Sequence, residues 1–161
     1  MNTTDFTFDI FKLTSTFYKD YPNTEYPEIM SKESRPYNCL LVSTNDYIMA
    51  IPYRTDLNEH NHFAYRFKTS KRSKNNASGL DYQKMIIITD TDYIESTGYS
   101  IDRDEYLETV KNIKRIVNEA VDYVETYKKH HSGVKPMNKW KYDRAYRFST
   151  LKYFHSELRI D

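Results

Sequence analysis

Four short stretches of the chain have the hydrophobic pattern of β-strands. Residues 6–11 alternate apolar and polar side chains, which predicts an edge strand with one buried face. Residues 37–42 and 47–51 are two further apolar stretches. The Thr-Asn-Asp sequence at 44–46 between them favours a hairpin turn, because Asn and Asp tolerate turn geometry. The three consecutive isoleucines within residues 84–89 predict a buried strand.

One long helix is the clearest element of the second half of the chain. Asp102 is placed to cap its N-terminus, with Glu105 three residues later as the reciprocal capping partner. Gly133 predicts its end, after His130 and His131, which suit the negative end of a helix. Apolar residues recur at close to helical spacing at Leu107, Val110, Ile113, Val117, Val121 and Val124.

Two shorter helices complete the predicted fold. Residues 13–21 predict a short helix that ends before Pro22, and a polar loop follows to residue 36. A last helix is predicted from near Ser149. Its buried face comprises Leu151, Phe154 and Leu158. The 161 residues contain no repeat or domain boundary, so we expect a single domain, residues 1–161, of the α+β class. In this domain a curved, mostly antiparallel sheet is covered by the long helix and the shorter ones.

Positive charge is concentrated in the middle third of the chain, although the formal net charge is only +1. Residues 1–34 contain six acidic and three basic residues, residues 35–84 four acidic and eight basic, and residues 85–161 thirteen of each. No acid occurs in residues 60–80, the basic segment. The basic residues there are Arg66, Lys68, Lys71, Arg72 and Lys74, interleaved with His60, His62, Tyr65 and Phe67. Cations beside exposed aromatic and imidazole groups predict a polyanion-binding surface, and a solvated basic loop is the alternative.

A second basic and aromatic strip covers residues 135–147, with the sequence KPMNKWKYDRAYR. In one interpretation its aromatic side chains stack on unpaired bases while its cations contact phosphates. In the other it is a connector whose aromatic side chains fill the core under the last helix. The burial of Trp140 decides between these interpretations.

Other classes of chemistry have weak support in the sequence. His60 and His62 are two residues apart, but no further ligands follow at a spacing typical of zinc sites, so we expect no metal ion and no other cofactor. The three glycines form no phosphate loop. The one cysteine, Cys39, lies in an apolar stretch and fits a buried thiol in a reducing cytoplasm. No signal peptide is visible, and no apolar stretch approaches the ~20 residues of a membrane span.

Metal-independent cleavage of RNA is a reaction for which the basic segment supplies suitable groups. The 2′-hydroxyl attacks the adjacent phosphate, which leaves a 2′,3′-cyclic phosphate and a 5′-hydroxyl. The enzyme must align the attack, move protons and stabilise added negative charge. Arginine suits the phosphate, and histidine suits proton transfer. The candidates in one region are Arg54, Thr55, His60, His62 and Lys68. The structural alternatives are a surface ion pair of Arg54 with Asp56 and an ordinary strand histidine at position 62.

The order of several sequence pieces resembles the type III toxin–antitoxin endoribonucleases of the ToxN, AbiQ and TenpN group. The pieces are RPYNCLLV, YIMAIPYRT, SGLDYQKMIII, the long helix from Asp102 and YRFSTLKYFHSEL, and they cover most of the chain from Arg35 onward. The closing STLKYFHSEL and the pairing of GLDY with the following strand are most similar to the TenpN branch. Toxins of this group, which act in abortive infection and phage defence, are neutralised by a repetitive pseudoknotted RNA.

The resemblance implies a compact barrel like those of the MazF and Kid toxins. It also implies an enzyme that cleaves mRNA and its own antitoxin precursor, and that assembles with the antitoxin RNA into a hetero-oligomer. Arg35 stands where ToxN-like members have a lysine before the first hairpin strand. Thr55 keeps one of two hydroxyl residues at the end of the second strand, and Arg54 replaces the other. A lysine that follows in those members falls at Leu57 here.

These observations together predict a metal-independent endoribonuclease toxin. Arg54 would stabilise the scissile phosphate, Thr55 would position it, and His62 or Lys68 would transfer protons. The predicted RNA contacts are Arg35, His60, Tyr65, Arg66, Thr69, Lys71, Arg72, Lys74 and Trp140. A non-catalytic RNA-binding module that uses the same surface is the first alternative. A protein-interaction domain whose basic loop is merely solvated is the second.

Overall fold

The computed structural model describes residues 5–31, 37–70, 77–95, 97 and 101–160. Its strands are β1 (Thr7–Leu13), β2 (Asn38–Ser43), β3 (Ile48–Arg54), β4 (Ala64–Arg66), β5 (Gly79–Asp81), β6 (Ile86–Ile88) and β7 (Ile94–Glu95). Its helices are α1 (Ser15–Asp20), α2 (Arg103–Lys111), α3 (Ile113–His131) and α4 (Lys139–Tyr146), with single 3-10 turns η1 (Tyr82–Lys84), η2 (Thr91–Tyr93) and η3 (Thr150–Tyr153). The α+β class is therefore confirmed.

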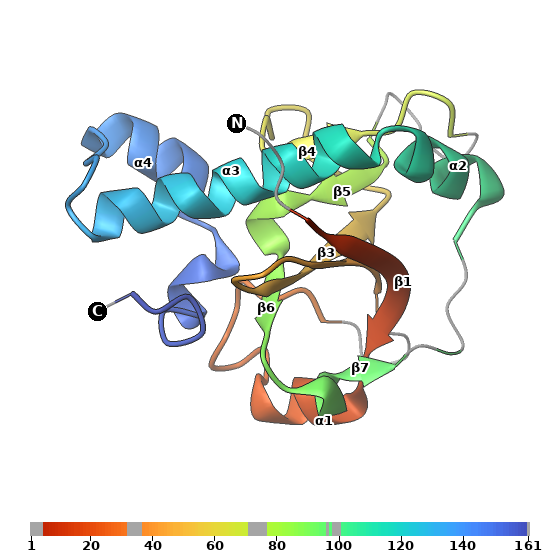
Figure 1. Cartoon of the computed structure of the whole chain (residues 1–161), viewed down its shortest axis with the longest axis horizontal. Coiled ribbons are helices and arrows are strands. Elements are labelled where there is room, and N and C mark those ends of the chain that lie inside the picture. Colours follow the sequence, from red (N-terminus) through yellow and green to blue (C-terminus); the bar gives the residue numbers. More distant parts are fainter. Residues whose placement is uncertain (1–4, 32–36, 71–76, 96, 98–100, 161) are drawn as a thin grey trace.

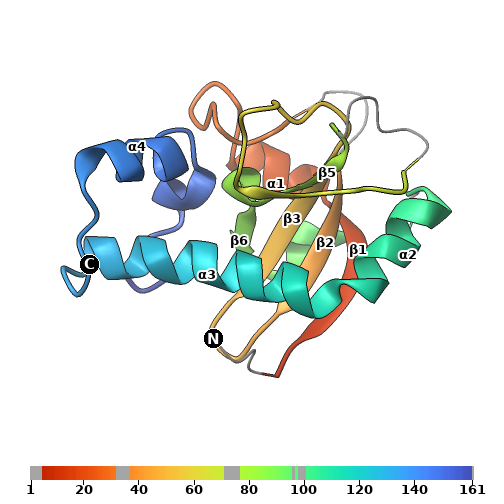
Figure 2. The same cartoon turned by 90° about the horizontal axis from the view of Figure 1, so that it is seen from above.

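All strand pairings are antiparallel, in the order β4-β5-β3-β2-β1-β7, with β6 also paired to β3. This path is open, so the closed barrel is not confirmed. In Figure 1, α3 runs along the top of the sheet and α1 lies at the bottom. Seen from above, α3 crosses β3 and β2, and α4 lies beside its C-terminal half (Figure 2). The buried apolar side chains form one cluster between these layers.

The predicted hairpin is confirmed. β2 pairs with β3 from Cys39 opposite Pro52 to Ser43 opposite Ile48, and the turn closes where the Thr44 N–H donates to the Tyr47 carbonyl oxygen at 3.0 Å. The prediction of an edge strand at residues 6–11 is wrong in one respect. β1 is a strand, but it lies between β2 and β7, because the short β7 pairs with its last two residues.

β5, η1 and β6 are consecutive and run antiparallel to the same edge of β3. On β3, two residues, Ile51 and Pro52, separate the stretch that pairs with β6 from the stretch that pairs with β5. On the partner chain segment, five residues, 81–85, separate the same two stretches. Pro52 has no N–H to donate to a ladder, and the pairing is interrupted beside it. The extra residues leave the sheet as η1, which directs Tyr82 towards α3 and Gln83 towards α4.

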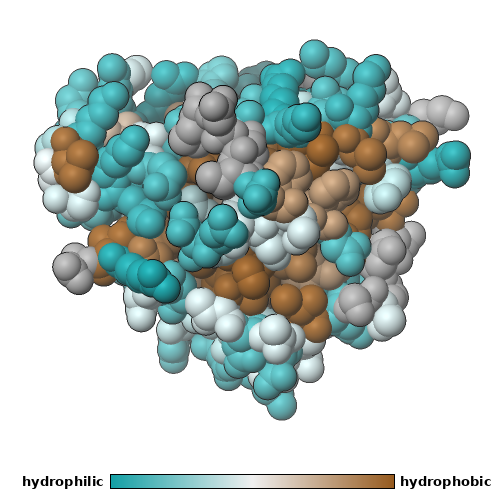
Figure 3. Space-filling view, in the orientation of Figure 1, coloured by the Kyte–Doolittle hydropathy of each residue, from teal (hydrophilic) through white to brown (hydrophobic). Residues whose placement is uncertain are grey.

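The long helix predicted from Asp102 is in fact two helices, α2 and α3. They meet at Asn112, whose backbone (φ −111°, ψ 20°) is not helical. The predicted apolar face is confirmed in α3, where Val117 and Val124 are fully buried. It is wrong in α2, where Leu107 is 50% exposed and Val110 is also exposed. Figure 3 shows apolar surface at the upper right, the position of α2 in Figure 1.

The buried side of α2 is polar instead. The predicted capping box is wrong, because Asp102 is the N-cap residue of α2 but makes no side-chain capping hydrogen bond. The Glu105 Oε2 instead accepts hydrogen bonds from the Ser70 and Ser78 hydroxyls, each at 2.5 Å. Glu108 accepts from the Lys68 and Thr69 backbone N–H groups at 3.0 Å, from the Thr69 hydroxyl and from the Tyr65 hydroxyl. Burial raises the pKa of Glu108, but these hydrogen bonds outweigh burial and hold it below its usual value. α2 therefore binds residues 65–70 and Ser78 through the side chains of Glu105 and Glu108.

The last predicted helix is shorter than expected. The structure forms only the 3-10 turn η3, with Ser149 accepting from the Leu151 N–H. The face predicted for this helix is nevertheless correct, since Leu151, Phe154 and Leu158 are all buried. The predicted short helix is α1, which Pro22 follows two residues after its last residue.

Candidate functional site

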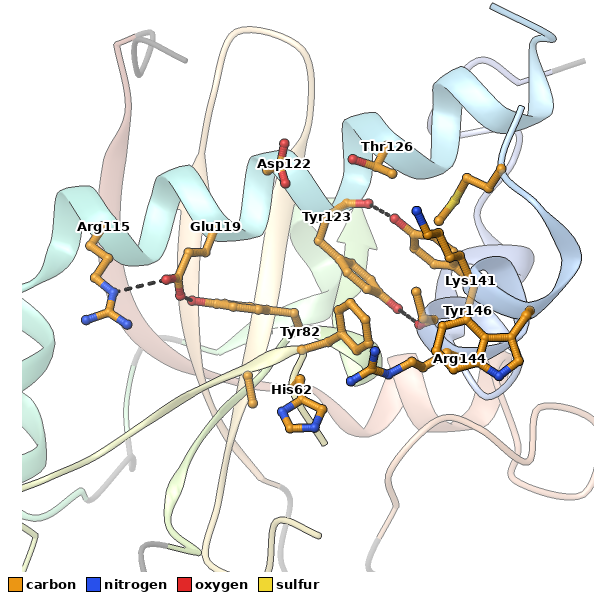
Figure 4. A pocket seen from close by; sticks show the side chains of 15 residues that line it. His62, Tyr82, Arg115, Glu119, Asp122, Tyr123, Thr126, Lys141, Arg144 and Tyr146 are labelled. Atoms are coloured by element: carbon orange, nitrogen blue, oxygen red, sulfur yellow. Dashed lines mark hydrogen bonds and ion pairs between the residues drawn. The ribbon is translucent and has the colours of Figure 1, made fainter. Parts of the chain in front are cut away.

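An open pocket of about 550 Å³ lies between the start of β4, η1, α3 and α4 (Figure 4). Its size is typical of sites for small molecules or single nucleotides. His62 reaches it from the chain before β4, and Trp140, Lys141 and Arg144 reach it from α4. The basic segment and the strip at residues 135–147, which are distant in sequence, therefore meet at one site.

Two buried tyrosines fix α4 against α3 at the back of the pocket. The Tyr123 hydroxyl donates to the Ala145 carbonyl oxygen, and the Tyr146 hydroxyl donates to the Tyr123 carbonyl oxygen, both at 2.7 Å. Burial raises the pKa of Tyr123 well above its ordinary value, so its hydroxyl is a neutral donor. The Gln83 amide of η1 adds a hydrogen bond to the Ala145 carbonyl oxygen at 3.1 Å. α4 is thus a rigid wall for the side chains that it presents.

That wall presents positive charge beside an exposed aromatic ring. Trp140 is 68% exposed, so the interpretation that places it in the core is wrong. The Arg144 guanidinium lies 5.6 Å from the Trp140 ring centroid. Neither Arg144 nor Lys141 forms an ion pair with any described residue. By contrast Tyr146, from the same strip, fills the core as the alternative interpretation predicts.

The α3 wall carries two acids in different states. The Glu119 carboxylate is engaged at both oxygens, by the Tyr82 hydroxyl at 2.9 Å and by the Arg115 guanidinium at 3.0 Å (Figure 4). Burial and the nearby Glu119 carboxylate raise the pKa of Tyr82, so its hydroxyl remains a donor. Asp122 is exposed, and within the described chain its carboxylate has no hydrogen bond or ion pair. Asp122 is therefore available to a ligand, whereas Glu119 is not.

The loop before β4 holds His62 at the pocket. The Asn61 side chain accepts from the Phe63 N–H at 2.8 Å and donates to Asp81 at 3.3 Å. Arg66 donates to the backbone carbonyl oxygens of Asn58 and Asn61. Arg66 therefore supports this loop, and the His62 imidazole stays exposed. His60, two residues earlier, lies 3.3 Å from the Glu59 carboxylate and does not line the pocket.

Arg54 has two carboxylate partners, at 2.9 Å in Asp81 and at 3.2 Å in Asp56. The ion pair with Asp56 was the structural alternative for this arginine, and it is present. The pair with Asp81 was not expected. Only 1% of the Asp81 side chain is exposed, and Asn61 and the Gln83 N–H also donate to it. Arg54 thus neutralises a buried carboxylate, and Thr55 beside it is exposed.

Replacing Arg54 with alanine is expected to lower the free energy of unfolding by about 2 kcal/mol, because the buried Asp81 carboxylate loses its cation but keeps two other donors. Replacing Asp56 with alanine is the control and should cost at most about 0.5 kcal/mol, since an exposed pair contributes little. Urea denaturation measures both. Equal stability of the two variants would contradict a structural role for Arg54.

Other predicted contact residues lie elsewhere. The expectation of exposed aromatic rings is wrong for Tyr65 and Phe67: Tyr65 is 3% exposed and Phe67 is fully buried, because both pack in the core under α2. Lys68 and Thr69 have exposed side chains, but they lie at the Glu108 contact and not at the pocket. Four predicted residues, Arg35, Lys71, Arg72 and Lys74, fall outside the described residues.

Three charged pocket residues were not anticipated from the sequence: Arg115, Glu119 and Asp122. They belong to the exposed side of α3, where charged residues are typical of any solvated helix, so composition gives no sign of a site. Their spacing of three and four residues was the only available signal, since it places them on one face.

Comparison with protein-family models, curated proteins and solved structures gives no match to this chain. In the part of the chain that the structure describes, no helix is long and apolar enough to cross a membrane. Fold and pocket together define an α+β protein with a basic, aromatic-lined site.

Proposed function

We propose that this protein is an endoribonuclease toxin that cleaves single-stranded RNA without a metal ion. The observation that carries the proposal is the pocket, which combines the exposed His62 imidazole, the exposed Trp140 ring and two cations, Lys141 and Arg144, that have no carboxylate partner among the described residues. Unpaired bases stack on exposed aromatic rings, and free cations bind phosphates.

The chemistry assigns roles to His62 and Arg144. His62 accepts or donates the proton during attack of the 2′-hydroxyl on the adjacent phosphate, since imidazole exchanges protons near neutral pH. Arg144 stabilises the negative charge that develops on the phosphate, because its guanidinium fork fits two phosphate oxygens. The role first predicted for Arg54 therefore passes to Arg144, since Arg54 already serves two carboxylates. Thr55 and Lys68 have no role in this version of the mechanism.

The resemblance to type III toxins supports the biological part of the proposal. mRNA and the antitoxin precursor are then the substrates, a repetitive pseudoknotted RNA is the inhibitor, and the cytoplasm is the site of action. The MazF-like barrel also belongs to the proposal. The strands follow an open antiparallel path, so the closure of the barrel belongs to the proposal alone.

A non-catalytic RNA-binding module is the second candidate. The engagement of Arg54 by Asp81 and Asp56 favours it, because the arginine that the sequence assigns to the phosphate is neutralised. The two candidates share the pocket and differ only in whether the bound strand is cut.

The direct test is incubation of the purified protein with end-labelled, mixed-sequence RNA in excess EDTA. We expect cleavage to continue and to leave 2′,3′-cyclic phosphate ends, because the mechanism uses only protein groups. Arg144→Ala should slow it strongly. Lys139→Ala is the matched control, since Lys139 lies on the same helix, pairs with Asp143 and does not line the pocket. Binding without cleavage would favour the second candidate, and a requirement for a divalent ion or a 5′-phosphate product would refute the mechanism.

A further inference from the structure

The α3 wall of the pocket offers a carboxylate that the proposed cleavage chemistry does not use. Asp122 lies on the opposite side of the pocket from Arg144 and His62 (Figure 4). Asp122 makes no hydrogen bond to any residue that the structure describes. A carboxylate in a site for a polyanion opposes phosphate binding, so its presence there favours contact with a different part of the RNA.

We infer that the pocket receives one unpaired nucleobase of the bound RNA and that Asp122 selects guanine. This inference rests on the proposed RNA-cleaving function and specifies its substrate. The volume of about 550 Å³ has room for one nucleotide and not for a duplex. Trp140, at 68% exposure, supplies the stacking surface. Arg144, 5.6 Å from its ring centroid, and Lys141, which also lines the pocket, are available for the flanking phosphates.

The choice of guanine follows from the hydrogen-bonding capacity of a carboxylate. An ionised carboxylate only accepts, and its two oxygens take two adjacent donors in a bidentate contact. Guanine presents two adjacent donors, N1–H and the 2-amino group, on its Watson–Crick edge. Adenine and cytosine each present one amino group beside an acceptor nitrogen, and uracil presents one N–H between two acceptor oxygens. Glu119 cannot take this role, because both of its oxygens are already engaged.

The experiment uses an oligouridine that contains one central guanosine, inosine or uridine. All sugars are 2′-O-methylated, so the strand cannot be cut and binding is measured alone. Trp140 is the only tryptophan of the chain, so its fluorescence reports stacking in the pocket directly. We expect guanosine to bind about tenfold more tightly than uridine, and inosine, which lacks the 2-amino group, to bind between them.

The decisive variant is Asp122→Asn, which replaces one acceptor oxygen with a donor and should remove the guanosine preference while retaining binding to oligouridine. Asp143→Asn is the matched control, because Asp143 lies on α4 outside the pocket, and it should retain the preference. Equal affinity for the three strands, or a preference that survives Asp122→Asn, would overturn the guanine inference and leave the proposed function standing. Failure of every strand to bind and to change Trp140 fluorescence would overturn both.

Discussion

Replacing Glu108 with alanine is expected to lower the free energy of unfolding by about 3–5 kcal/mol. Glu108 is 8% exposed and accepts from Tyr65, Lys68 and Thr69, so its removal leaves two partly buried backbone N–H groups and a buried hydroxyl without an acceptor. Each such group costs about 1–3 kcal/mol when it stays unsatisfied. Urea denaturation followed by circular dichroism measures the loss.

Leu107→Ala is the control for this prediction, since Leu107 precedes Glu108 on α2 and is half exposed. An apolar side chain at an exposed position should cost at most about 0.5 kcal/mol. Glu108→Gln keeps one carbonyl acceptor and should fall between the two. A Glu108→Ala variant as stable as Leu107→Ala would mean that the contacts of α2 with residues 65–69 contribute nothing to the fold.

Glu108 also shows where interpretation of the sequence pattern fails. The apolar residues of α2 do recur at helical spacing, but they are exposed and the polar face of the helix is buried. The polar face is buried because Glu105 and Glu108 accept hydrogen bonds from a segment about 30 to 40 residues away. A pattern of single residues cannot indicate that a carboxylate has found buried partners. The same limit applies to Arg54, whose neighbour Asp56 was visible locally while Asp81 was not. Local features such as the hairpin and the core face of α3 were predictable because adjacent residues determine them.

The candidate site was predictable only in parts. His62 and Trp140 were identified separately, because a charge run interleaved with aromatic residues is unusual in composition. That they share a pocket depends on the η1 excursion beside Pro52 and on the buried hydrogen bonds of Tyr123 and Tyr146. Those features arise from tertiary packing. Tyr65 has the same explanation. The basic and aromatic composition of its segment suggested an exposed ring, but a tyrosine is equally suited to burial when its hydroxyl donates to a carboxylate, here that of Glu108.

His62→Gln is expected to reduce the single-turnover rate of RNA cleavage by about 10²–10³-fold, because glutamine keeps polarity and approximate size but cannot transfer a proton. Affinity for a 2′-O-methylated strand should stay close to that of the original protein. Stability should also be unchanged, since the imidazole is exposed and has no hydrogen bond with the described part of the chain. A loss of rate without loss of affinity or stability identifies a group that acts in the chemical step.

His60→Gln provides the matched comparison, because His60 is also exposed, lies two residues away and pairs with Glu59 outside the pocket. The His60→Gln variant should cleave at the rate of the original protein. It makes the same replacement in the same loop as His62→Gln, but the pocket keeps the His62 imidazole. Equal loss of rate in both variants would point to a general electrostatic effect of the basic segment. Full activity of His62→Gln would mean that His62 does not act in the chemical step. Lys68, whose side chain is exposed beside α2, would then be the residue to test for proton transfer.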